Sequence, residues 1–130
     1  MKRRVVVTGI GIVSAVGTGT EKAWQNLLAG ESGGAPITLF DAKDYPVTFA
    51  AEVKDFNPED FIEKKEVRKY DRFIHFALAA SEFAVKMAGL PGAPGLDLER
   101  VGVYIGSGIG GFSTIESEHS KLVTGGPRKV

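Results

Sequence analysis

The 130-residue chain contains no cysteine, and it has only two histidines, His75 and His119. The missing thiols exclude disulfides, cysteine-ligated zinc, iron–sulfur ligation and a cysteine nucleophile within these residues. Two histidines are too few for a His-rich metal site, and the apolar surroundings of His75 favour a core position over a catalytic one. We therefore expect no metal and no cofactor, and we assign no catalytic residue to this chain.

The chain also lacks net charge, because 16 lysines and arginines balance 16 aspartates and glutamates. A dedicated nucleic-acid binder usually carries a clear basic excess, so we expect no nucleic-acid partner. No apolar run reaches the ~18–20 residues that span a bilayer. The composition, 43% apolar and 25% charged, is that of an ordinary globular domain.

The N-terminus resembles a secretory signal peptide only superficially. Residues 2–4 are basic and Val5–Gly17 is mostly apolar, as in a leader sequence. Signal peptides usually have a helical centre rich in leucine and alanine, whereas this run is β-branched and is interrupted by glycines. We therefore expect a cytoplasmic protein with no membrane partner.

The first half of the chain alternates strand and helix patterns. Val5–Val7 is a β-branched run typical of a strand buried on both faces, and a Gly-rich loop follows it. Thr20 can cap a helix over Glu21–Ala29, which carries an apolar stripe. Glycines and prolines make residues 31–47 typical of irregular structure, and Thr48–Val53 fits a short strand.

The second half continues this alternation. Asn57–Asp60 is typical of a helix start, with an Asn cap, a proline at the first position and acidic residues in the first turn. Asp71–Ala88 predicts a long helix that is apolar around nearly its whole circumference and must pack on more than one side. Val101–Ile105 predicts a second buried strand, and residues 112–123 predict a last helix.

This order of elements indicates an α/β layered fold. Two long buried strands are too few for a complete sheet, and the apolar helix has no obvious second layer against which to pack. We therefore expect the chain to be one part of a larger protein, or to complete its core with a partner.

Gly106, Gly108 and Gly111 match the G-x-G-x-x-G pattern of a dinucleotide-binding loop between a strand and a helix. That fingerprint also needs a second strand ending in an acidic residue about 20 residues later, and the chain offers none. Gly9 and Gly11, in a similar setting, lack the third glycine. For both segments we favour glycines that permit tight turns and close backbone contact.

Four basic residues recur at helical spacing, so that on a helix they would share one face. They are Lys65, Arg68, Lys69 and Arg72. Acidic residues are interleaved with them, which hides the patch in the total charge. One interpretation is a solvated helix face with internal ion pairs. The other is a docking surface for an acidic partner, where such charges mainly raise the association rate and set the orientation.

Five segments occur in a specific order, although each alone is a weak signal. They are Arg3–Gly11 with Ser14 and Val16-Gly17, Gly30–Gly33, Lys65–Lys69 with Asp71–Phe73, Gly106–Gly111, and Gly125–Lys129. Together they resemble the β-ketoacyl-acyl-carrier-protein synthases, which are condensing enzymes of the thiolase superfamily. The form GSGIGG is most similar to synthase II. Ala15 stands where many members have proline.

The resemblance implies a thiolase-like fold, with two α/β halves stacked in α-β-α-β-α layers, usually in a homodimer. It implies decarboxylative condensation of an acyl thioester with malonyl-acyl-carrier protein in fatty-acid elongation, through one cysteine and two histidines. None of these three lies here. Residues 1–130 would be the incomplete N-terminal part of the first half of one ketosynthase domain, with no separate second domain, and we expect this chain alone to be inactive.

The resemblance also implies roles for individual positions. Ile109, with Gly108 beside it, matches the isoleucine that lines and gates the acyl pocket, so both are expected to bind substrate. Basic positions that contact the acidic acyl carrier protein match five residues here: Lys65, Arg68, Lys69, Arg128 and Lys129.

Two other interpretations stay open. One is a ketosynthase of polyketide assembly, which shares the fold and the opening motif. The other is a non-catalytic α/β module that docks an acidic protein.

Overall fold

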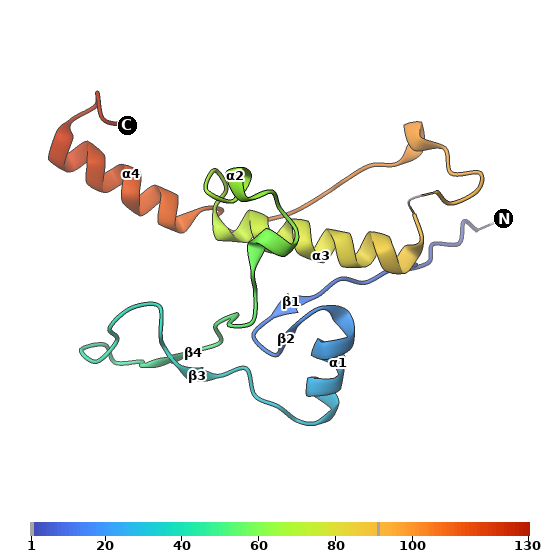
Figure 1. The fold of residues 1–130 in the computed structure, drawn as a ribbon, viewed down its shortest axis with the longest axis horizontal. Helices are drawn as coiled ribbons and strands as arrows, with labels where there is room; N and C mark the ends of the chain where they lie inside the picture. The colour runs from blue at the N-terminus through green and yellow to red at the C-terminus, as the bar shows by residue number, and fades with distance from the viewer. Residues whose placement is uncertain (1, 91) are drawn as a thin grey trace. The chain divides into compact units, whose positions relative to one another are not determined.

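The structure is a computed structural model that describes residues 2–90 and 92–130. Its elements are β1 (Val13–Ser14), β2 (Gly17–Thr18), α1 (Thr20–Leu28), β3 (Ala35–Pro36), β4 (Phe49–Ala50), α2 (Lys64–Val67), α3 (Arg72–Ala88) and α4 (Phe112–Gly125) (Figure 1). Short 3-10 turns lie at Pro58–Asp60 and Leu98–Arg100. Helices and strands are mixed along the chain, as the sequence pattern predicts.

The chain divides into two compact units. Unit 1 comprises Met1–Asn57 and Ala79–Leu96, and unit 2 comprises Pro58–Leu78 and Asp97–Val130. Every contact that positions the candidate site lies within unit 2. Within the described part of the chain, no helix is both long enough and apolar enough to cross a membrane.

Unit 1 opens with a glycine-rich hairpin that leads into α1. β1 and β2 pair antiparallel, with Val13 opposite Thr18, and Ala23 of α1 is fully buried. Gly19 precedes the helix with a φ of 93°, which glycine adopts without steric strain. Gly19 holds the cap position, so Thr20 is the first residue of the helix and not its cap. The Thr20 hydroxyl donates to the Ile10 carbonyl at 2.7 Å.

A second hairpin occupies part of the segment expected to be irregular. β3, within residues 31–47, pairs antiparallel with β4, so the expected strand at Thr48–Val53 is confirmed but is shorter. Beyond the paired residues, the carboxylate of Glu52 accepts hydrogen bonds from the amide (3.0 Å) and the hydroxyl (2.7 Å) of Thr38. The hydrogen bond from the Thr38 amide is the main cause of the lowered pKa of Glu52.

The N-terminal segment crosses α3 at a point where both backbones come close together. A Cβ on Gly9 would overlap the carbonyl oxygen of Ala84, and a Cβ on Gly11 would overlap that of Ala80. Between them, the amide of Ile10 lies 3.4 Å from the sulfur of Met87. For Gly9 and Gly11, close backbone contact is confirmed.

Neither of the two expected buried strands is formed. Val5–Val7 and Val101–Ile105 belong to no strand, and their side chains are exposed, to 93% at Val5 and 100% at Tyr104. A strand needs a neighbour with which to exchange backbone hydrogen bonds, and within residues 2–90 and 92–130 no strand pairs with either run. The prediction of two buried strands is therefore wrong for the chain by itself.

The long helix is confirmed almost to the residue. α3 ends before Gly89, whose φ of 63° suits glycine. His75 and Ala79 on α3 are buried, as the sequence pattern favours for His75, whereas Leu78 and Met87 are exposed. The helix therefore has buried and half-buried positions, and its apolar surface is uncovered at Leu78, Val85 and Met87. α4 extends two residues beyond its expected end.

Replacing Gly11 by alanine should destabilise the fold, because the new Cβ would overlap the Ala80 carbonyl oxygen. Overfilling a closely packed contact costs about 1–3 kcal/mol, and denaturant unfolding would measure this loss. Gly34→Ala is the matched control, because a Cβ there meets only the Ser32 hydroxyl at 3.5 Å. Equal stability of the two variants would contradict the close crossing of the two backbones.

Candidate functional site

The basic segment, defined here as residues 64–72, is broken into two helices. α2 ends at Val67, and the amide of Lys69 then bonds to the Glu66 carbonyl at 2.9 Å, which tightens the turn. α3 begins anew at Arg72. The expectation that Lys65, Arg68, Lys69 and Arg72 share one helical face is therefore wrong. The helix start expected at Asn57–Asp60 likewise forms only a single 3-10 turn.

The lysines of the basic segment are paired, yet they stay exposed. Lys65 Nζ lies 2.6 Å from Glu63 Oε2, and Lys69 Nζ lies 2.8 Å from Glu66 Oε1, with the two lysine side chains 72% and 62% exposed. Exposed pairs of this kind contribute about 0–1 kcal/mol, so a partner's carboxylate can replace either one at little cost. Arg68 is exposed and forms no ion pair with the residues that the structure describes.

A buried histidine holds the end of α2 against α3. His75 is 8% exposed, and its Nε2 lies 3.0 Å from the carbonyl oxygen of Val67. The carbonyl can only accept, so Nε2 carries the hydrogen in this contact. The contact gives His75 a structural role beside the basic segment.

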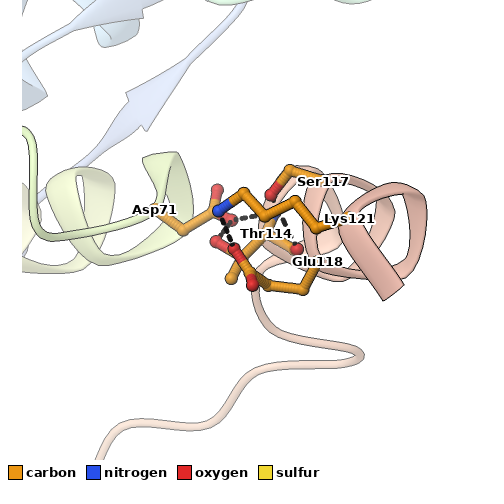
Figure 2. Close-up of polar contacts among 5 residues, drawn as sticks. All are labelled: Asp71, Thr114, Ser117, Glu118 and Lys121. Atoms are coloured by element: carbon orange, nitrogen blue, oxygen red, sulfur yellow. Dashed lines mark hydrogen bonds and ion pairs between the residues drawn. The ribbon is translucent and has the colours of Figure 1, made fainter. Parts of the chain in front are cut away.

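One carboxylate joins the start of α3 to the first turn of α4 (Figure 2). Asp71 Oδ1 accepts the amide of Arg72 at 2.7 Å, while Oδ2 accepts the amide (3.1 Å) and the hydroxyl (2.8 Å) of Thr114. First-turn amides have no partner within their own helix, so Asp71 caps two helices at once. The Thr114 hydroxyl is the main cause of the lowered pKa of Asp71, followed by the Thr114 amide.

Gly111 makes room for this carboxylate. It is the residue before α4 and offers no side-chain cap, and a Cβ on it would overlap the Asp71 carboxylate. Gly106 and Gly108, by contrast, have open space where a Cβ would lie. Within the Gly106–Gly111 motif, the close approach that glycine permits is therefore seen at its last position.

The other expected site residues are exposed. Ile109 is 70% exposed and lies beside a tight turn in which the Ser107 hydroxyl accepts the amide of Gly110 at 3.0 Å. Arg128 and Lys129 follow α4 on the surface. Among the described residues, no ion pair joins either of them to the basic segment. Their roles in binding substrate or carrier protein stay predictions.

A hollow of about 370 Å³ lies between the start of α3 and the first turns of α4. It is lined by Arg68, Lys69, Tyr70, Asp71, Arg72, Ser113, Thr114 and Ser117. Sequence reasoning identified its cations but missed Asp71 and the serines and threonine of α4. An aspartate just before an apolar helix signals a cap, but nothing local points to a partner 43 residues further along the chain.

Two solved ketosynthases share this fold over the whole chain. The ishigamide ketosynthase/chain length factor has a TM-score of 0.77 and 33% identity, and the match covers 100% of this chain and 32% of that one. A ketosynthase in complex with its type II polyketide acyl-carrier protein has a TM-score of 0.77 and 28% identity, with 100% and 34% covered. The chain therefore has part of a thiolase-like ketosynthase fold and matches the N-terminal third of these structures.

The sequence comparisons give the family. The family model described as the N-terminal domain of beta-ketoacyl synthase matches residues 2–129, so the chain belongs to the beta-ketoacyl synthase family. The 3-oxoacyl-[acyl-carrier-protein] synthase 2 of Coxiella burnetii is 48% identical and that of Vibrio harveyi 49% identical, each over 129 residues. Both alignments cover 99% of this chain but 31% of the relative. The resemblance seen in the motifs is confirmed.

Replacing Thr114 by valine should raise the pKa of Asp71 toward its ordinary value, because the Thr114 hydroxyl is the main cause of the lowering. Thr114→Ser keeps a hydroxyl and should keep the lowered pKa. An NMR titration of the Asp71 carboxyl would measure the pKa in both variants. The folded pKa is depressed, so the stabilisation is present above the unfolded value of about 3.9 and is lost as the pH falls through the folded value.

The stability of Thr114→Val should therefore depend less steeply on pH below about pH 4 than that of Thr114→Ser. Acid unfolding followed by circular dichroism would compare the two variants. An identical Asp71 pKa in both would contradict the hydroxyl as the dominant influence.

Proposed function

We propose that this chain is the N-terminal part of a 3-oxoacyl-[acyl-carrier-protein] synthase 2, an acyltransferase of fatty-acid elongation. The observation that carries the proposal is the 48–49% identity to two such synthases over 99% of the chain. The solved ketosynthase in complex with a type II polyketide acyl-carrier protein matches at 28% identity, which favours the fatty-acid enzyme over polyketide assembly.

The proposed reaction joins an acyl group to malonyl-acyl-carrier protein. In this family a cysteine takes the acyl group from its thioester, the malonyl α-carbon attacks it, and carbon dioxide leaves. The sequence has no cysteine, and a thiolate nucleophile is essential to that route. We therefore propose that the nucleophile lies outside these 130 residues and that the chain alone is inactive.

The complete protein would be a single ketosynthase domain in a cytoplasmic homodimer. The coverage of about a third of each relative supports a longer protein. The exposed apolar runs at Val5–Val7 and Val101–Ile105 support it as well, because such β-branched runs are typical of strands covered on both faces. In the complete domain these runs would find the strand neighbours that they lack in the structure.

An acidic acyl carrier protein would dock on Lys65, Arg68, Lys69, Arg128 and Lys129. All five side chains are exposed, and the carboxylates that pair with two of them are held weakly enough to be exchanged. One structural relative is itself a ketosynthase in complex with an acyl-carrier protein. The docked carrier would deliver acyl and malonyl thioesters.

Reversing two of these charges should weaken carrier binding by the full-length protein. Lys65→Glu with Lys69→Glu should lower affinity about tenfold at low salt and flatten its salt dependence, because exposed charges act chiefly through long-range attraction. Titration of acyl carrier protein at several salt concentrations would measure both effects.

Lys43→Glu with Lys54→Glu is the matched control, because it makes the same change in net charge on exposed lysines of unit 1. If both double variants lost affinity equally, the effect would be one of total charge. If Lys65→Glu with Lys69→Glu left the affinity for acyl carrier protein unchanged, the basic segment would be a solvated surface with no part in docking.

Ile109 would gate the acyl pocket, with Gly108 beside it. Ile109→Phe in the full-length protein should preserve condensation of short acyl primers and suppress that of long ones. The added ring cannot enter a packed wall without about 1–3 kcal/mol of strain, so it would occupy the acyl channel instead. Carbon dioxide release and product length across a ladder of acyl primers would measure the effect.

The same assay tests the proposed reaction itself, because the wild-type protein must release carbon dioxide from malonyl-carrier protein. No release would contradict the synthase assignment. A uniform loss across all primers that follows a lowered melting temperature would place Ile109 in the ordinary core and remove it from the pocket.

A further inference from the structure

The hollow beside Asp71 has a strongly cationic wall on one side. Arg68, Lys69 and Arg72 all line it. Arg72 also lies over the ring of Phe76, with its Cζ 5.1 Å from the ring centroid, which limits the freedom of its side chain. Three cations therefore line one small space.

The opposite wall belongs to α4 and is built from hydroxyl groups. Ser113, Thr114 and Ser117 line it. Thr114 donates to Asp71, and Ser117 donates to the Thr114 carbonyl at 3.0 Å. The hydroxyl of Ser113 makes no hydrogen bond with the residues that the structure describes, so it can donate to an incoming group.

The single carboxylate in the wall does not cancel the positive charge. Asp71 Oδ1 accepts a hydrogen bond from the Arg72 amide. Its Oδ2 accepts hydrogen bonds from the amide and the hydroxyl of Thr114 (Figure 2). Its negative charge lies at the N-termini of two helices, where unpaired amide hydrogens carry partial positive charge. Lys69 shares its charge with Glu66 at 2.8 Å. Arg68 is exposed and forms no ion pair with the residues that the structure describes, so its charge leaves the hollow with a net attraction for an anion.

We infer that this hollow receives a carboxylate side chain of the acidic carrier protein, so that the docking surface extends from the basic segment onto Ser113 of α4. The inference rests on the proposed docking function and adds a specific seat to it. Guanidinium and ammonium groups on one side and a hydroxyl on the other are the donors that a carboxylate requires. A carboxylate seated there would bridge α3 and α4 at the point where Asp71 already joins them.

Placing an aspartate in the hollow should block the seat. Ser113→Asp in the full-length protein should weaken carrier-protein binding about tenfold at low salt, because two like charges would compete for the same cations. The helix should keep its fold, since an acidic residue in the first turn is favourable. Melting temperature would be recorded for each variant.

Ser120→Asp is the matched control. Ser120 lies on the same helix, is exposed and does not line the hollow, so the change in net charge is identical and only its place differs. We expect less than a twofold effect from Ser120→Asp. Equal effects of the two substitutions, or no effect of either, would overturn the seat in the hollow.

A second experiment identifies the carrier-protein carboxylate that binds in the hollow. Acidic residues of the carrier protein would be neutralised one at a time, and one of these changes should abolish the difference between Ser113→Asp and Ser120→Asp. If none does, the hollow holds no carrier carboxylate. If the wild-type protein does not bind carrier at all, docking itself fails, which is distinct from binding without a preference between the two serine positions.

Discussion

The carboxylate of Asp71 is the interaction on which the arrangement of unit 2 depends. It accepts hydrogen bonds from the amide of Arg72 and from the amide and the hydroxyl of Thr114. Thr114 lies 43 positions after Asp71 in the chain. α4 begins after Gly111, which has no side chain to cap it. Without Asp71, the first turn of α4 would lose its partner in unit 2, and the hollow between the two helices would lose its second wall.

Glycine acts in both units by leaving space for another group. In unit 1, Gly9 and Gly11 let the N-terminal backbone approach the carbonyl groups of Ala84 and Ala80, and in unit 2, Gly111 admits the Asp71 carboxylate. A Cβ at any of these three glycines would destabilise the fold, because it would have to displace a carbonyl or carboxylate group.

The break between α2 and α3 decides where the basic residues lie. On one continuous helix they would form a stripe, but the turn after Val67, held by His75, divides them. Lys64, Lys65 and Arg68 line one hollow, whereas Arg68, Lys69 and Arg72 line another. Arg68 therefore belongs to both. Weak surface ion pairs leave these charges exchangeable, as the proposed docking of a carrier protein requires.

The sequence by itself determined the helices at α1, α3 and α4 and the family, because caps, helical periodicity and ordered motifs are encoded by residues close together in the chain. Only the tertiary structure decided that Asp71 pairs with Thr114 and that Ser113 lines the same hollow as Arg68. It also decided that Val5–Val7 has no strand neighbour among the residues that the structure describes. The physical reason is that a hydrogen bond between residues 43 apart, or a strand's need for a partner, depends on the path of the whole chain and leaves no periodic trace in the local sequence.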